Sequence, residues 1–191
     1  MQKINCTFCK VKDTSLINNV VVENDPFWIL YDSFPVTTPH YLVIPKEHRE
    51  TYSELPLSHF QEVLKIVDLL KASINKKTLI YEHGGIGQTI NHAHLHVMPQ
   101  EKLNLEKLIS DISIPGTLKK LDTLQDIVKY RNYFLFVFEG KPFIFLPEQL
   151  HIEPGIITNT IARILGKPYP ATKRSKVTTA LIRHFTITRK V

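Results

Sequence analysis

The chain of 191 residues is 43% hydrophobic and 22% charged, and its formal net charge at neutral pH is +6. This length admits one large core, or a core of about 110 residues with an appendage. The longest apolar runs, such as residues 134–138, are far shorter than the roughly 20 residues that span a bilayer, and the start of the chain does not resemble a signal peptide. These features exclude a transmembrane protein, and we expect a cytoplasmic protein without a membrane partner.

The positive charge is concentrated at the C-terminal end. No Asp or Glu follows Glu153, whereas eight Lys and Arg residues do. Their charge exceeds the net charge of the whole chain, so the part up to Glu153 carries a net charge of −2. The basic pI therefore describes the tail, and it does not indicate a nucleic-acid surface on the rest of the chain.

Both cysteines of the chain lie together, as Cys6 and Cys9 in a C-x-x-C motif. Such a pair can be a redox centre, a disulfide or half of a metal site. A cytosolic protein rarely keeps a structural disulfide, and a thioredoxin-type pair would follow a strand and open a long helix. A zinc site would need two further ligands from elsewhere in the chain.

The next segments predict antiparallel strands. Residues 18–22 and 27–31 are rich in β-branched and aromatic residues, and the turn-like Glu-Asn-Asp-Pro between them predicts a hairpin. A loop with two prolines follows, and it leads to a predicted strand at 40–45 and then to His48. His48 alone is more typical of a surface histidine. Phe27 could flank a bound base, although a place in the strand core explains it at least as well.

Residues 57–70 predict the clearest helix, because apolar side chains recur on one face and Ser-x-x-Gln at 58–61 fits a capping box. Residues 78–82 predict a strand, and the chain then turns back through a glycine-rich segment that ends at Gly87. Free backbone N–H groups in such a loop could meet phosphate oxygens.

Three histidines alternate with apolar residues in the following segment. On a β-strand, His92, His94 and His96 would share one face, while the apolar residues between them would enter a core. Residues two apart lie roughly 6.7 Å from each other, so the outer histidines would be on the order of 13 Å apart at Cα. Since a zinc–nitrogen bond is about 2 Å long, one ion cannot bind all three, and the three rings have different tasks.

The Gly-Gln-Thr that leads into this histidine strand, the proline that closes it, and the earlier order of strand, Asp32, proline loop, His40 and strand resemble the signature of the histidine triad (HIT) family of nucleotide hydrolases and transferases. The resemblance covers residues 4–99. It implies an α+β fold with an antiparallel five-stranded sheet and flanking helices, in a catalytic domain of residues 1–100. It also implies a nucleotide substrate, and a homodimer is one expectation because family members are commonly dimers.

The resemblance implies roles for individual residues as well. His94 would attack the α-phosphorus and carry the nucleotidyl group, while a backbone carbonyl would hold its Nδ1–H. His96 would donate to a phosphate oxygen or to the leaving group, and Gln88 and Thr89 would stabilise charge and position water. Asp32 would bind the ribose hydroxyls, and the backbone at Gly87 would meet the phosphate.

Some members of the family, and the related galactose-1-phosphate uridylyltransferases, hold zinc with a C-x-x-C pair, a histidine after a Pro-Lys strand end and the first triad histidine. The matching residues here are Cys6, Cys9, His48 and His92. The resemblance thus implies a structural Zn²⁺ in a closed Cys₂His₂ site. One departure is Tyr81, because many members have Asn or Gln there, near the phosphate bridge or leaving group. The preference for a leaving group stays open at this point.

Residues 101–191 form a predicted C-terminal extension of α/β character with a basic tail. The expected elements are helices at 104–110, 118–129 and 156–165, strands at 133–138 and 142–146, and one strand or helix near 177–187.

Several functions are open on these grounds. The first is a zinc-containing hydrolase that cleaves the α-phosphate linkage of a dinucleoside polyphosphate, such as a diadenosine polyphosphate, or of a nucleoside phosphoramidate. The second is a nucleotidyltransferase or phosphorylase with the same intermediate. The third is a processor of adenylated nucleic-acid ends, which the tail argues against because it has few aromatic residues and no finger motif. In a fourth, His92 and His94 would bind a catalytic metal ion.

Overall fold

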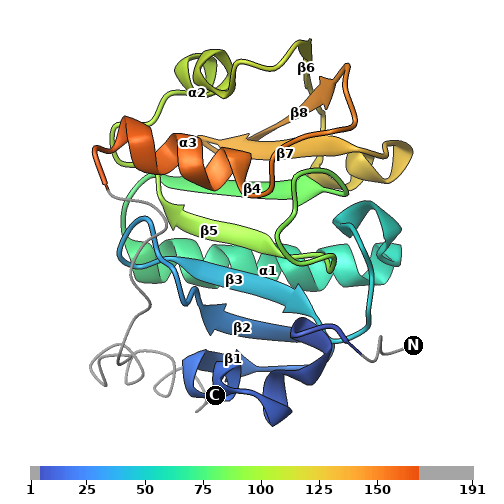
Figure 1. Ribbon diagram of the computed structural model, residues 1–191. Coiled ribbons are helices and arrows are strands. Elements are labelled where there is room, and N and C mark those ends of the chain that lie inside the picture. The colour runs from blue at the N-terminus through green and yellow to red at the C-terminus, as the bar shows by residue number, and fades with distance from the viewer. Residues whose placement is uncertain (1–4, 168–191) are drawn as a thin grey trace.

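The computed structural model describes residues 5–167, whose strands form one antiparallel sheet in the order β1-β2-β3-β5-β4-β7-β8-β6 (Figure 1). The strands are β1 Val20–Glu23, β2 Phe27–Tyr31, β3 Tyr41–Pro45, β4 Thr78–Gly84, β5 Leu95–Pro99, β6 Gly116–Lys120, β7 Tyr133–Phe138 and β8 Lys141–Pro147. The α-helices are α1 Leu57–Ile74, α2 Leu105–Ile112 and α3 Ile156–Ile164, and the 3-10 helices are η1 Phe8–Asp13, η2 Ser15–Asn19, η3 Tyr52–Glu54 and η4 Leu124–Lys129.

The predicted α+β class with an antiparallel sheet is confirmed, but the predicted number of five strands is wrong, because the sheet has eight. Strands β1 to β5 occupy five neighbouring positions, and the extension continues the sheet where β7 pairs with β4 from Ile80 to Gly84. An uncovered edge would leave a row of unpaired backbone groups, and β7 satisfies those of β4. Whether residues 1–100 and 101–191 are separate domains stays a prediction.

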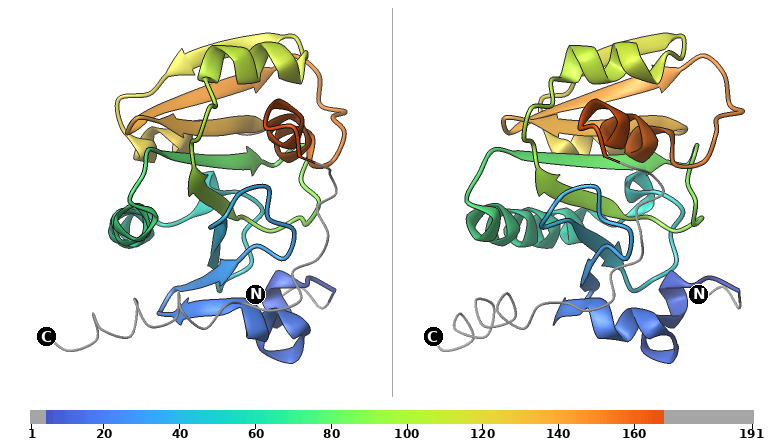
Figure 2. Two further views of the ribbon diagram at one scale, coloured as in Figure 1. Left: turned by 90° about the vertical axis from the view of Figure 1, so that its left-hand side faces the viewer. Right: turned by 60° about the vertical axis from the view of Figure 1, so that its left-hand side comes forward.

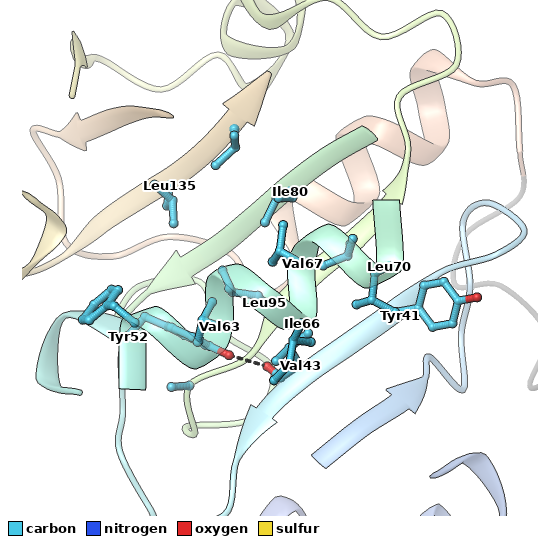
Figure 3. Packing of buried hydrophobic residues seen from close by; sticks show 14 of the residues in the cluster. Tyr41, Val43, Tyr52, Val63, Ile66, Val67, Leu70, Ile80, Leu95 and Leu135 are labelled. Carbon is cyan, nitrogen blue, oxygen red and sulfur yellow. Dashed lines mark hydrogen bonds between the residues drawn. The ribbon is translucent and has the colours of Figure 1, made fainter. Parts of the chain in front are cut away.

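Helix α1 covers one face of the sheet, as Figure 3 shows. Its buried side chains are Phe60, Val63, Ile66, Val67, Leu70 and Ile74. Each fully buried side chain of this kind stabilises the fold by about 1.5–3 kcal/mol. Next to them, the hydroxyl of Tyr52 donates to the carbonyl of Val43 at 2.8 Å (Figure 3). The predicted capping box at 58–61 is wrong, because the helix begins after Pro56 without a side-chain cap.

The opposite face of the sheet is covered in two parts. Helices α2 and α3 pack over β4, β7 and β8, whereas η1 packs over β2 and β3. Figure 2 shows α1 and α3 on opposite sides of the sheet. The N-terminal segment and the C-terminal extension therefore flank the same face, and the candidate site lies between them.

The predicted helix at 118–129 is wrong, because its first part is strand β6 and its last part is η4. Leu118 lies opposite Phe145 of β8, so an available strand edge outweighs the local helix pattern. The other elements predicted between 101 and 167 are confirmed to within a few residues. The element predicted near 177–187 and most of the basic tail lie outside the described residues. None of the helices within residues 5–167 has the length and apolar character needed to cross a membrane.

Candidate active site

The three alternating histidines are brought to one face of the sheet at the start of β5. His92 and His94 precede the strand, and His96 lies within it. The residues between and after them, such as Leu95 and Val97, enter the core beneath α1. All three histidines are buried. The alternation predicted from the sequence is therefore confirmed, although the strand itself begins only at Leu95.

The ring of His94 is held by the backbone. Its Nδ1 lies 2.6 Å from the carbonyl oxygen of His92, which is the contact that the expected mechanism requires. When Nδ1–H donates to this carbonyl, Nε2 keeps its lone pair. Burial lowers the pKa of His94, although the His92 carbonyl and the Asp32 carboxylate act in the opposite direction. The buried ring is therefore neutral near pH 7 and can act as a nucleophile.

His96 is oriented by His40, a residue to which the sequence reasoning gave no role. The backbone N–H of Val36 donates to Nδ1 of His40 at 3.4 Å, so the proton of His40 sits on Nε2. That nitrogen lies 3.0 Å from Nδ1 of His96 and donates to it. The proton of His96 is thereby placed on Nε2. Burial, and then the neighbouring histidines, hold the pKa of His96 well below its usual range, so this ring is a neutral donor.

Asp32 lies beside this pair. Its Oδ1 accepts the backbone N–H of Phe34 at 2.8 Å, and its Oδ2 lies 3.5 Å from Nδ1 of His40 and 3.7 Å from Nδ1 of His96. The backbone N–H of Asp32 donates to the carbonyl of His40 at 2.9 Å. In the sequence, Asp32 and His40 stand at the two ends of the same proline loop. This position is the sequence signal that could have pointed to His40.

A cavity of about 510 Å³ opens next to these residues, and Asp32, His94 and His96 all line it. Its two ends differ in character. The end formed by η1, η2, β2 and β3 is mainly apolar, because its lining includes Phe8, Leu16, Leu30 and Leu42, although the hydroxyl residues Thr14 and Ser15 line the cavity as well. The other end is lined by His83, Thr89, Gly155 and Thr158. A ligand with a flat apolar group at one end and a polar group at the other fits this division.

Phe27, which the sequence offered either as a base contact or as a strand-core residue, does not line the cavity. It is completely buried on the α1 side, where its ring is stacked on Tyr52 with 6.4 Å between the centroids. Alternate residues of a strand face opposite sides, so Leu30 points to the cavity while Phe27 does not. The alternation was visible in the sequence, but the choice of face depended on where α1 packs.

Only one residue of the Gly-Gln-Thr segment at 87–89 lines the cavity. Thr89 lines the cavity, whereas Nε2 of Gln88 donates to the carbonyl of Glu50 at 2.9 Å. Gly87, at φ +64°, accepts the backbone N–H of Gly155 at 2.8 Å, and a Cβ there would lie 3.2 Å from a methyl carbon of Ile152. Gly87 thus joins the histidine loop to the extension, and neither it nor Gln88 lines the cavity.

The expected zinc ligands gather from three segments of the chain. The ligand atoms of Cys6, Cys9, His48 and His92 all lie within 4.8 Å of one another. The two Nδ1 atoms are 3.2 Å apart, and the sulfur–nitrogen distances are 3.3 Å from Cys6 to His92, 3.3 Å from Cys9 to His48 and 3.6 Å from Cys9 to His92. A tetrahedral zinc ion with ordinary bond lengths requires ligand separations of roughly 3.3–3.8 Å. The residues therefore fit the ion.

The surroundings of His92 support this interpretation. Its Nε2 lies 2.8 Å from the carbonyl oxygen of Pro45, so the N–H on this side leaves the Nδ1 lone pair directed at the cysteines. Among residues 5–167, the group of ligand atoms around His92 does not include His94, so these two histidines do not form a common metal site. A second group of three residues, Asp32, His40 and His96, also has ligand atoms within 4.8 Å, but the hydrogen bond between its histidines occupies the facing nitrogens.

Comparisons with known proteins show what the chain is similar to. The HIT domain model matches residues 14–103. The chain is 33% identical over 116 residues to an uncharacterized HIT-like protein of Mycoplasma pneumoniae. The matched region covers 55% of this chain and 78% of that protein. It is 30% identical over 105 residues to adenylylsulfatase HINT3 of Arabidopsis thaliana, over 51% of this chain and 53% of that protein. A hypothetical histidine triad nucleotide-binding protein of Sulfolobus tokodaii is 33% identical with a TM-score of 0.44, over 52% of this chain and 71% of that structure.

Proposed function

This chain belongs to the HIT family, and we propose that it is a nucleotide hydrolase that cleaves the linkage at the α-phosphorus through a nucleotidyl intermediate on His94. Its proposed substrates are nucleoside phosphoramidates or dinucleoside polyphosphates. The observation that carries the proposal is the ring of His94, which lines the cavity in a neutral form whose Nε2 lone pair is left available by the Nδ1 contact to the His92 carbonyl. The adenylylsulfatase among the relatives supports an adenylyl substrate.

The two ends of the cavity suggest how a nucleotide would bind. The base would lie at the apolar end, between side chains such as Phe8 and Leu42. The carboxylate of Asp32 would accept hydrogen bonds from the ribose hydroxyls. In this arrangement the α-phosphate would lie next to His94 and His96, which line the same cavity.

The first chemical step forms a bond between Nε2 of His94 and the α-phosphorus, while the bond from phosphorus to the leaving group breaks. The Nδ1–H of His94 stays on the His92 carbonyl, which stabilises the positive charge on the ring. His96 donates its Nε2–H to a phosphate oxygen. The leaving group takes its proton from solvent.

In the second step, water attacks the phosphorus, the nitrogen–phosphorus bond breaks, and a nucleoside monophosphate is released with the loss of one proton to solvent. Thr89 would position this water. A role for Gln88 requires its amide to leave the Glu50 carbonyl, which it contacts at 2.9 Å.

We propose that Cys6, Cys9, His48 and His92 hold a zinc ion. When bound, it supplies structural cross-linking of the N-terminal segment to the histidine loop. The ring of Phe8, inside the C-x-x-C motif, lies 5.3 Å from the ring of His94 and forms part of the cavity wall. The site would therefore stabilise the apolar end of the cavity and take no part in the chemical steps.

The test is a covalent trap. Purified protein is incubated with adenosine 5′-phosphoramidate or diadenosine tetraphosphate, quenched in alkali, which preserves phosphoramidate bonds, and examined by intact mass and product chromatography. We expect an adenylyl adduct and release of the monophosphate, both lost in His94→Ala and both kept in His151→Ala, an exposed histidine. Turnover that persists in His94→Ala would refute the proposal. A nucleoside diphosphate formed only when inorganic phosphate is added would identify a phosphorylase.

A further inference from the structure

The C-terminal extension forms part of the catalytic cavity. Gly155 and Thr158, at the start of α3, line it together with His94 and His96. These residues are far apart in the sequence, and they meet because α3 packs on the face of β4 and β7 that carries the histidines. The family resemblance ends near residue 99, so this wall belongs to the C-terminal extension.

Thr158 is connected to the catalytic histidines through Tyr81. The Thr158 Oγ1 lies 2.9 Å from the Tyr81 hydroxyl. The Tyr81 ring is stacked on the His96 ring, with 4.2 Å between centroids and an interplanar angle of 3°. Beside them, the backbone N–H of Ile157 donates to Nε2 of His83 at 3.4 Å. The first turn of α3 is therefore fitted to two β4 side chains that neighbour His96.

We infer that the first turn of α3 is the leaving-group wall of the active site, that Thr158 contacts the leaving group, and that this wall selects nucleoside phosphoramidates over dinucleoside polyphosphates. The inference rests on the proposed function. A nucleoside at the apolar end of the cavity, with its ribose at Asp32, leaves only the end lined by Thr158 for the group that departs opposite the attacking His94.

The charge of this end determines which leaving group fits. Among the residues of the described chain that line the cavity, none is Lys or Arg. Burial lowers the pKa of His83 to about 3, so this ring is also uncharged. A polyphosphate leaving group carries several negative charges, which sites for such groups neutralise with cationic side chains or metal ions. A small amine, which carries no negative charge, is compatible with the neutral hydroxyl and imidazole groups found here.

The inference is tested by steady-state kinetics with adenosine 5′-phosphoramidate and diadenosine tetraphosphate. We expect kcat/KM of the native protein to be at least about tenfold higher for the phosphoramidate. Thr158→Val should lower that value by about tenfold, the effect of losing one hydrogen bond at the reacting group. The matched control is Thr160→Val, since Thr160 is also buried in the same helix and does not line the cavity. Its kcat/KM should stay within about twofold of native.

Binding of adenosine monophosphate, measured by calorimetry, distinguishes an effect at the leaving-group end of the cavity from an effect at the nucleoside end. Its affinity should be the same in both variants, because this product lacks the leaving group. If Thr158→Val does not fold, Tyr81→Phe removes the hydroxyl that positions Thr158, and it should lower kcat/KM for the phosphoramidate in the same direction. Thermal unfolding of each variant verifies that the protein is folded.

Two results would overturn the inference alone: equal kinetics of Thr158→Val and Thr160→Val, or preference of the native protein for diadenosine tetraphosphate. If either result is found while turnover is still lost in His94→Ala, the proposed function holds and only the inference fails. Absence of turnover with both substrates would refute the proposed function and the inference with it.

Discussion

The titration of Glu82 tests the core between residues 1–100 and the C-terminal extension, because this side chain contacts Tyr52 in the first part and Tyr133 in the second. Its carboxyl group is completely buried on the α1 side of β4, where Oε1 accepts the backbone N–H of Tyr52 and Oε2 accepts the hydroxyl of Tyr133, both at 2.7 Å. Burial raises the pKa of Glu82 to about 8, although these two hydrogen bonds act in the opposite direction. Near neutral pH the folded protein therefore keeps a proton that the unfolded chain loses.

This difference makes stability depend on pH. An acid whose pKa is raised on folding contributes its full stability below the pKa of the unfolded chain, and that contribution is lost as pH rises through the pKa of the folded state. The pKa of Glu82 rises from an ordinary value of 4.5 in the unfolded chain to about 8 in the folded protein. Each pKa unit corresponds to about 1.4 kcal/mol, so the total is roughly 5 kcal/mol, of which about 4 kcal/mol falls between pH 5 and pH 9.

Glu82→Gln keeps the size of the side chain and removes its titration. We expect the free energy of unfolding of this variant, relative to native, to rise by about 4 kcal/mol from pH 5 to pH 9. The measurement is urea unfolding of both proteins across this range, and the contributions of the histidines cancel in the difference. Glu148→Gln, at an exposed position, should run parallel to native. Parallel curves for Glu82→Gln and native would refute the argument.

Three further predictions concern the metal site, the sheet and the nucleophile. Cys9→Ser should reduce bound zinc from about one equivalent to almost none and lower the free energy of unfolding by about 3 kcal/mol or more, as metal analysis and urea unfolding can show. Gly84→Ala should destabilise the fold by about 2–3 kcal/mol in urea unfolding, because the added Cβ would come closer than 3.0 Å to the ring of Tyr133. Because burial lowers the pKa of His94, and an imidazole with a lowered pKa loses its proton at lower pH, the acid limb of the kcat/KM profile should lie below pH 6.5.

Each of these predictions has a matched comparison. Zinc content and stability should be native in His151→Gln, an exposed histidine outside the cluster. Full zinc occupancy in Cys9→Ser would argue against the Cys₂His₂ site. In Gly140→Ala the added Cβ meets nothing within 4 Å, and only the left-handed backbone at φ +77° opposes it, at a cost of about 1–2 kcal/mol. This variant should therefore be destabilised by less than Gly84→Ala, and the reverse order would contradict the packing argument. An acid limb at or above pH 7 would show that the His94 ring is charged at neutral pH.

The local pattern of the sequence was sufficient for much of the first half of the fold. The alternation of His92, His94 and His96 with apolar residues determines which side chains share a face, because alternate residues of a strand always point to opposite sides. The apolar periodicity of residues 57–70 likewise predicted α1. Structural features that depend only on residues close together in the sequence could therefore be predicted from it.

The helix predicted at 118–129 fails for the opposite reason. Residues 116–120 become β6 because the edge of β8 offers them backbone partners, and a strand partner cannot be identified from local propensity. The eight-stranded sheet has the same origin, since nothing near residue 133 in the sequence shows that β7 will cover β4.

The candidate site shows the same division. The sequence pointed to the candidate metal ligands, to the two histidines that line the cavity and to Asp32 through its resemblance to the HIT family, because the motif residues that carry this resemblance can be read in the chain itself. The tertiary structure alone decided that Phe27 faces α1, that His40 orients His96, and that Thr158 meets Tyr81 across 77 residues of chain. The physical reason is that these contacts depend on which faces of the elements pack together, and packing is set by the whole core.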